Sequence, residues 1–186
     1  FEEVYNLNGG INGWNGFTAT GPEELNLDII RGDETPIEIV KVAYRMENAL
    51  AEFYRNVSTM TDDQEVSALA TKLASIEDRH KGFLVDLLGS MDSSGISAAI
   101  LGPEDTALLA EGGFSGQELI ERNRDVLDSV ANLLDLALMI EAQALDLYLR
   151  LERKVQDDSG RALLRRIAEE EKGHLAALGD LRDKRV

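Results

Sequence analysis

Hydrophobic residues recur every three to four positions along four long stretches of the chain, which predicts four amphipathic helices. The first is expected from Thr35, where Pro36 suits the first turn and Glu38 completes a Thr-x-x-Glu capping box. The other three helices follow the same periodicity and are expected near residues 61–88, 129–155 and 158–183. The connection within each successive pair is very short, which favours two antiparallel hairpins.

A glycine- and proline-punctuated segment, residues 89–128, separates the two halves of this pattern. Within it, Ser115 and Glu118 could cap a short helix. The segment does not suit a tight hairpin turn, but it is long enough to cross the length of a bundle. The pattern therefore predicts an all-α protein, with residues 35–186 forming a four-helix bundle of two hairpins joined by a long crossover.

The two hairpins are related by an internal repeat. When the chain is shifted by 94 residues without a gap, many residues of the first hairpin meet an identical residue in the second. The repeat includes both histidines of the chain, and its acidic and imidazole pairs are Glu47 with Glu141, Glu77 with Glu171, and His80 with His174. We interpret the chain as a duplicated helical hairpin, which predicts a bundle with pseudo-twofold symmetry.

The repeated residues suit metal binding. A glutamate and a histidine three residues apart on a helix point to the same side. The helix faces around Glu47 and Glu141 are otherwise apolar, and unpaired carboxylates on a core face cost several kcal/mol each. Two divalent cations would compensate four such carboxylates, and oxygen with imidazole ligands suits iron, manganese or zinc. The competing interpretation is a solvated set of surface charges, because a lone Glu-x-x-His is weak evidence.

The arrangement resembles the ferritin-like superfamily, and within it the rubrerythrin-related di-iron carboxylate proteins, over about residues 35–183. The resemblance implies a ferritin-like four-helix bundle holding two iron ions, with manganese or zinc as alternatives. The implied ligands are Glu47 and His80 for one metal, Glu141 and His174 for the other, and Glu77 and Glu171 as bridges.

Two tyrosines also recur in the repeat, at positions two helical turns beyond the first glutamate of each half. Tyr54 and Tyr148 would lie on nearly the same faces as Glu47 and Glu141. We expect them either to hydrogen-bond to a ligand carboxylate or to be ordinary core residues. The flanking residues Glu169 and Glu170 are expected to be surface residues.

The chain departs from the rubrerythrin pattern in two respects. It has no cysteine, which excludes the cysteine-ligated rubredoxin module and leaves an external electron donor as the expected partner. Ala144 stands where the third helix of rubrerythrins carries a second ligand glutamate. Three functions stay open: a di-iron oxidoreductase that reduces peroxide or dioxygen, a non-catalytic iron-binding or storage protein, and a structural dimetal module. The first is the favoured hypothesis.

The first 20 residues are glycine-dense and do not fit a helical bundle. Residues 4–14, with their Gly-Gly-Ile-x-x-Trp pattern, resemble the closing strand and helix of a rhodanese-like domain. The sulfur-carrying cysteine of rhodaneses lies upstream of this segment and none is present here, so no sulfurtransferase activity is expected. We interpret residues 1–20 as the remnant of a rhodanese-like domain and residues 21–34 as a linker. Since Phe1 opens mid-domain sequence, we expect the native N-terminus to lie upstream.

The composition restricts which partners and which cellular location are expected. A formal net charge of −16 argues against nucleic acid or an anionic membrane surface as a partner. No apolar run approaches the roughly 20 residues needed to span a bilayer, and no signal peptide is visible, so a cytoplasmic protein is expected. Helical-hairpin bundles commonly pair, which makes a homodimer the expected assembly.

Overall fold

The computed structural model describes residues 31–91, 116–124, 127 and 129–184, and it confirms the all-α prediction. Within these residues the regular secondary structure is entirely helical, comprising α2 (Pro36–Met60), α3 (Gln64–Met91), α4 (Gly116–Asn123), α5 (Val130–Lys154) and α6 (Asp158–Asp183). The predicted rhodanese-like remnant and most of the predicted linker lie outside the described residues.

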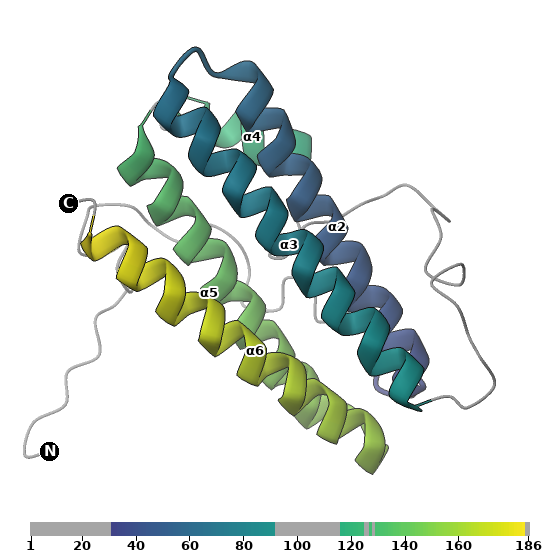
Figure 1. The fold of residues 1–186 in the computed structure, drawn as a ribbon. Coiled ribbons are helices and arrows are strands. Elements are labelled where there is room, and N and C mark those ends of the chain that lie inside the picture. Colours follow the sequence, from purple (N-terminus) through teal and green to yellow (C-terminus); the bar gives the residue numbers. More distant parts are fainter. Residues whose placement is uncertain (1–30, 92–115, 125–126, 128, 185–186) are drawn as a thin grey trace, which may run out of the picture.

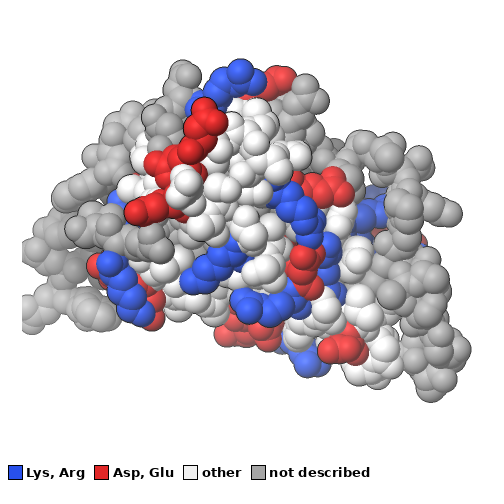
Figure 2. All heavy atoms as spheres, turned by 45° about the horizontal axis from the view of Figure 1, so that its top comes forward, with Lys and Arg blue, Asp and Glu red and all other residues white. Residues whose placement is uncertain are grey.

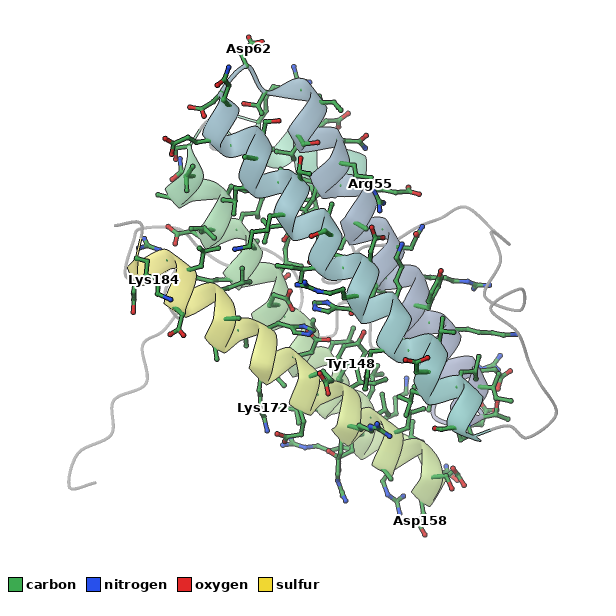
Figure 3. The ribbon with its side chains drawn as sticks, viewed as in Figure 1. Arg55, Asp62, Tyr148, Asp158, Lys172 and Lys184 are labelled. Atoms are coloured by element: carbon green, nitrogen blue, oxygen red, sulfur yellow. The ribbon has the colours of Figure 1, made fainter. Side chains whose placement is uncertain are left out.

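The four long helices form two antiparallel hairpins, α2–α3 and α5–α6, that pack against each other (Figure 1). Asp62 in the first hairpin turn and Asp158 beside the second mark opposite ends of the bundle (Figure 3). Helix α3 therefore ends near the second turn, whereas α5 begins near the first. The connection from α3 to α5 has to cross the length of the bundle, as predicted. The short helix α4 falls within this connection and packs against α2.

Side-chain caps fix most of the helix boundaries near their predicted positions. The Glu38 N–H donates to Thr35 Oγ1 at 3.3 Å, and the Thr35 N–H donates to Glu38 Oε2 at 2.7 Å, which confirms the capping box. Ser129 caps α5 and Asp157 caps α6 in the same way, each accepting from a backbone N–H in the first turn.

The predicted start of α3 at Thr61 is wrong by one turn. Thr61 is instead the C-cap of α2, where its N–H donates to the Val57 carbonyl. Helix α3 starts at Gln64 because Oδ1 of Asp63 accepts the backbone N–H groups of Glu65 and Val66, at 2.7 and 3.1 Å. Asp63, and not Thr61, therefore caps the N-terminus of α3.

The end of the predicted linker, residues 31–34, is attached to the turn between α5 and α6. The Gln156 N–H donates to the Gly32 carbonyl at 3.2 Å. The buried carboxylate of Glu34 accepts the backbone N–H groups of Arg31 and Gly32, at 2.6 and 2.8 Å. Gly32 has a φ of 108°, and a β-carbon there would lie 2.9 Å from the Lys154 carbonyl oxygen, so this approach requires glycine.

Two hydrophobic clusters fill the bundle, one toward each end. The cluster toward the α2–α3 turn takes its buried residues from 49–57, 66–74, 119–120, 133–140 and 178. The cluster toward the α5–α6 turn takes them from 39–46, 84–88, 144–155 and 163–168. Each large buried side chain contributes roughly 1.5–3 kcal/mol. The interval between the two clusters on every long helix is where the predicted metal ligands lie.

The surface carries mixed charges. On the face shown in Figure 2, acidic and basic side chains are interspersed, so the net charge of −16 is not concentrated in one patch there. Among the described helices, none has an apolar stretch long enough to cross a membrane.

Candidate metal centre

The polar layer between the two hydrophobic clusters contains four buried glutamates and both histidines of the chain. The glutamates are Glu47 on α2, Glu77 on α3, Glu141 on α5 and Glu171 on α6, and none is more than 3% exposed. Each is surrounded along its own helix by residues of the two clusters. The fold thus brings together all six residues that the sequence predicts as metal ligands.

In the first hairpin, Nδ1 of His80 lies 2.8 Å from Glu77 Oε2 and 3.4 Å from Glu47 Oε2. One potential ligand atom from each of these three residues lies within 4.8 Å of the other two. The second hairpin repeats this geometry. Nδ1 of His174 lies 3.0 Å from Glu171 Oε2 and 3.6 Å from Glu141 Oε2, and these three residues meet the same distance limit.

The two glutamate–histidine clusters are joined by their histidines. The imidazole rings of His80 and His174 stack with their centroids 3.4 Å apart and their planes only 3° from parallel. Because α3 and α6 each contribute one ring, the contact links the two hairpins through equivalent positions of the repeat. The two clusters therefore form one continuous site.

Comparison with known protein families supports the helical-bundle fold that the repeat predicts. The Ferritin-like domain family matches residues 35–184, which include the five helices of the described residues. The chain belongs to this ferritin-like family. The N-terminal segment that resembles a rhodanese-like domain lies outside the match.

Two solved structures are similar to the chain at low sequence identity. A hypothetical protein from Pyrococcus furiosus is 22% identical, with a TM-score of 0.49 over 87% of this chain and 94% of its own. A protein from Thermotoga maritima, proposed to be a ferritin-like diiron-carboxylate protein, is 18% identical, with a TM-score of 0.48 over 84% of this chain and 100% of its own. No curated protein is significantly similar to the chain.

The two halves of the ferritin-like site differ electrostatically in the metal-free protein. Burial, together with the nearby carboxyls of Glu77 and Glu141, raises the pKa of Glu47 to about 8 against the opposing effect of His80. Burial likewise raises the pKa of Glu77 to about 8, with Glu141 adding to the effect. Burial also acts on Glu141, but its interactions with His174 and Glu171 outweigh it and lower the pKa of that carboxyl.

Several buried polar atoms of the site lack a hydrogen bond within the described part of the chain. They are the Oε2 atoms of Glu47, Glu77 and Glu141 and the Nδ1 atom of His80, whose 2.8 Å contact with Glu77 Oε2 is an ion-pair contact without hydrogen-bond geometry. Leaving one such atom unsatisfied costs about 1–3 kcal/mol, and more for a charged group. Cations placed among these atoms would satisfy them, and carboxylate oxygens with imidazole nitrogens fit iron, manganese or zinc. The residues therefore fit the dimetal group that the resemblance implies.

The remaining sequence-predicted residues lie close to the site along the helices. Tyr54 and Tyr148 are almost completely buried, and each belongs to a different hydrophobic cluster. Figure 3 labels Tyr148 in the interior of the bundle. Whether either hydroxyl supports a ligand carboxylate stays a prediction. Ala144 is fully buried in the cluster toward the α5–α6 turn, so that position adds no ligand to the site.

Sequence reasoning missed one residue beside the site. A pocket of about 20 Å³ adjoins the centre, and Glu170 lines it together with Glu47, Glu171 and both histidines. Glu169 and Glu170 are both exposed, as expected, but only Glu170 lines this pocket. The repeat could not have indicated it, because Ile76 occupies the corresponding position in the first hairpin.

Proposed function

We propose that the chain is a rubrerythrin-like di-iron protein, an oxidoreductase that reduces peroxide or dioxygen at a dinuclear iron site. The observation that supports this most strongly is the stacking of His80 on His174, which brings two glutamate–histidine clusters, six potential ligands in all, next to each other. A donor set of four carboxylates and two imidazoles is typical of di-iron carboxylate bundles.

Each ligand has a defined place in this proposal. Glu47 and His80 would hold one iron, Glu141 and His174 the other, and Glu77 and Glu171 would bridge them. When bound, two ferrous ions would supply electrons to dioxygen or peroxide. The hydrophobic clusters on both sides limit the access of water to the centre. An external electron donor is part of the proposal, because the chain has no cysteine for a rubredoxin-type module.

Substitution of a bridging residue tests the proposal. Glu77→Ala should reduce both iron binding and turnover with peroxide and a chemical electron donor. Asp86→Ala removes an exposed acidic residue from the same helix and should leave both unchanged. Undiminished turnover in Glu77→Ala would exclude the proposed reaction. Ferrous oxidation and uptake by the unsubstituted protein without sustained turnover would instead support an iron-binding or storage role.

A further inference from the structure

We infer that divalent metal ions reach the centre through the pocket between α3 and α6, and that Glu170 is the carboxylate that first receives them. The inference rests on the proposed metal centre. It assigns to Glu170 a role distinct from that of the six ligands, namely capture of the incoming cation at the mouth of the pocket.

The pocket connects the surface with the centre. Its lining residues range from exposed to buried: Glu170 is exposed, the side chains of His80 and His174 are 11% and 15% exposed, and Glu47 and Glu171 are 3% and 1% exposed. Its volume of about 20 Å³ accommodates roughly one water-sized group. A cation that enters here therefore meets the histidines and glutamates of both hairpins.

The buried end of the pocket contains atoms that need a partner. Glu47 Oε2 and His80 Nδ1 both belong to residues that line it. They lie 3.4 Å apart, and among the described residues neither makes a hydrogen bond of good geometry. Both atoms are potential donors to a divalent cation. These unsatisfied atoms, in addition to the exposed carboxylate at the mouth, indicate that the pocket leads a cation inward.

The residues that line the pocket also depart from the 94-residue repeat. The repeat places Ile76 opposite Glu170 and Ala177 opposite Phe83, another residue that lines the pocket. The Ile76 side chain is half-buried and packs against the cluster toward the α2–α3 turn. The symmetry-related side of the centre therefore has an apolar residue where this side has a carboxylate, and we infer that cations approach from the Glu170 side.

Glu170 differs from its acidic neighbour in its interactions. Glu169 Oε1 accepts a hydrogen bond from Lys172 Nζ at 2.5 Å, and Figure 3 shows Lys172 pointing away from the bundle. Among the described residues, Glu170 has no ion pair within 4.0 Å. Its carboxylate is therefore available to attract a cation. Negative charge at the mouth of a cleft raises the local concentration of cations and their association rate, with an effect that weakens as salt is added.

The test is the rate at which metal-free protein binds Co²⁺, followed by stopped-flow absorbance at low and high ionic strength. Glu170→Gln should slow association roughly three- to tenfold at low salt, with less effect at high salt. The equilibrium stoichiometry of two ions and the thermal stability of the loaded protein should be retained. Glu169→Gln removes the same charge one residue away and is the matched control, so it should bind Co²⁺ at nearly the unsubstituted rate.

Several outcomes would overturn the inference. Unchanged association in Glu170→Gln, or equal slowing in both variants, would exclude a specific role for Glu170 in capture. A lower stoichiometry in Glu170→Gln would make it a ligand instead of a capture residue. If the unsubstituted protein binds no Co²⁺ at all, the proposed metal centre itself fails. If it binds two ions and only the kinetic difference is missing, the centre stands and the access route is wrong.

Discussion

The imidazoles of His80 and His174 stack face to face, 3.4 Å apart, although the two residues come from different hairpins. They occupy the same position in the two copies of the repeat. Each ring also lies within 3.0 Å of a buried glutamate oxygen on its own helix. The contact therefore places the proposed ligands of the two hairpins in one layer, where a substitution at either histidine should affect both proposed metal positions.

Removal of one imidazole should weaken metal binding in both halves of the centre. His80→Ala deletes a proposed ligand and also one side of the stacked pair, so we expect at least roughly tenfold weaker binding and fewer than two ions retained. Anaerobic titration with Fe²⁺, followed by metal analysis after desalting, measures both quantities. A variant that still binds two ions with undiminished affinity would show that His80 is not a ligand.

The metal-free protein should lose stability as the pH rises. The pKa of Glu47 and Glu77 is about 8 in the folded protein, against an ordinary value of 4.5. Between these values the folded state binds more protons than the unfolded state, so stability is greatest below about pH 4.5 for these groups and falls toward pH 8. Bound metal should oppose this trend, because cations bind the ionised carboxylates more tightly as the pH rises. Thermal unfolding across this range, with and without Co²⁺, measures both effects.

Two amide variants make this prediction specific. Glu47→Gln removes a carboxyl whose pKa is raised, so the decline in stability with pH should become shallower. Glu141→Gln removes a carboxyl whose own pKa is lowered, by His174 and Glu171 against the effect of burial, but whose charge raises the pKa of Glu47 and Glu77. It should therefore flatten the decline less than Glu47→Gln does. If Glu47→Gln leaves the pH dependence of unfolding unaltered, the raised pKa of Glu47 does not cause the loss of stability with rising pH.

The tyrosine hydroxyls should matter for the metal more than for the fold. Tyr54→Phe and Tyr148→Phe retain the buried rings, so the folded structure should survive, whereas loss of a hydrogen bond to a ligand would weaken metal binding roughly tenfold. Tyr54→Ala, in contrast, should cost about 3–5 kcal/mol through the cavity it leaves. Metal titration together with chemical denaturation separates the two effects. Unaltered affinity in both phenylalanine variants would make the tyrosines core residues only.

Glycine positions in the helices should respond differently to alanine. At Gly160, a β-carbon would lie 2.9 Å from Val155 Cγ1 and 3.2 Å from Ile39 Cδ1, so Gly160→Ala should destabilise the protein by about 1 kcal/mol. A β-carbon at Gly89 would meet nothing within 4 Å, so Gly89→Ala should stabilise by roughly 0.5–1 kcal/mol. Urea denaturation measures the free energy of unfolding of both variants. Stabilisation by both substitutions would indicate that the site around Gly160 relaxes without cost.

The sequence predicted those features that depend on local signals or on the repeat. The capping box at Thr35 and the start of α6 at Asp158 are local, and the six clustered residues follow from the duplicated pattern. Features that depend on tertiary proximity were not predictable. The attachment of Gly32 to the turn before α6 and the position of Glu170 beside the centre both join residues that are distant in sequence.

The start of α3 was missed for a different reason, because two adjacent candidates compete. Both Thr61 and Asp63 are good N-cap residues, and their order in the sequence does not decide between them. The structure resolves the choice, since the Asp63 side chain accepts two backbone N–H groups while Thr61 closes α2.

The most direct measurement for the whole account is the number of ferrous ions that the metal-free protein binds per chain under anaerobic conditions. A centre formed by both hairpins should take up two ions, and Glu171→Ala, which removes a proposed bridge, should lower the number. If the unsubstituted protein binds no iron, or if it and Glu171→Ala bind the same number of ferrous ions, a dinuclear centre in this layer is contradicted.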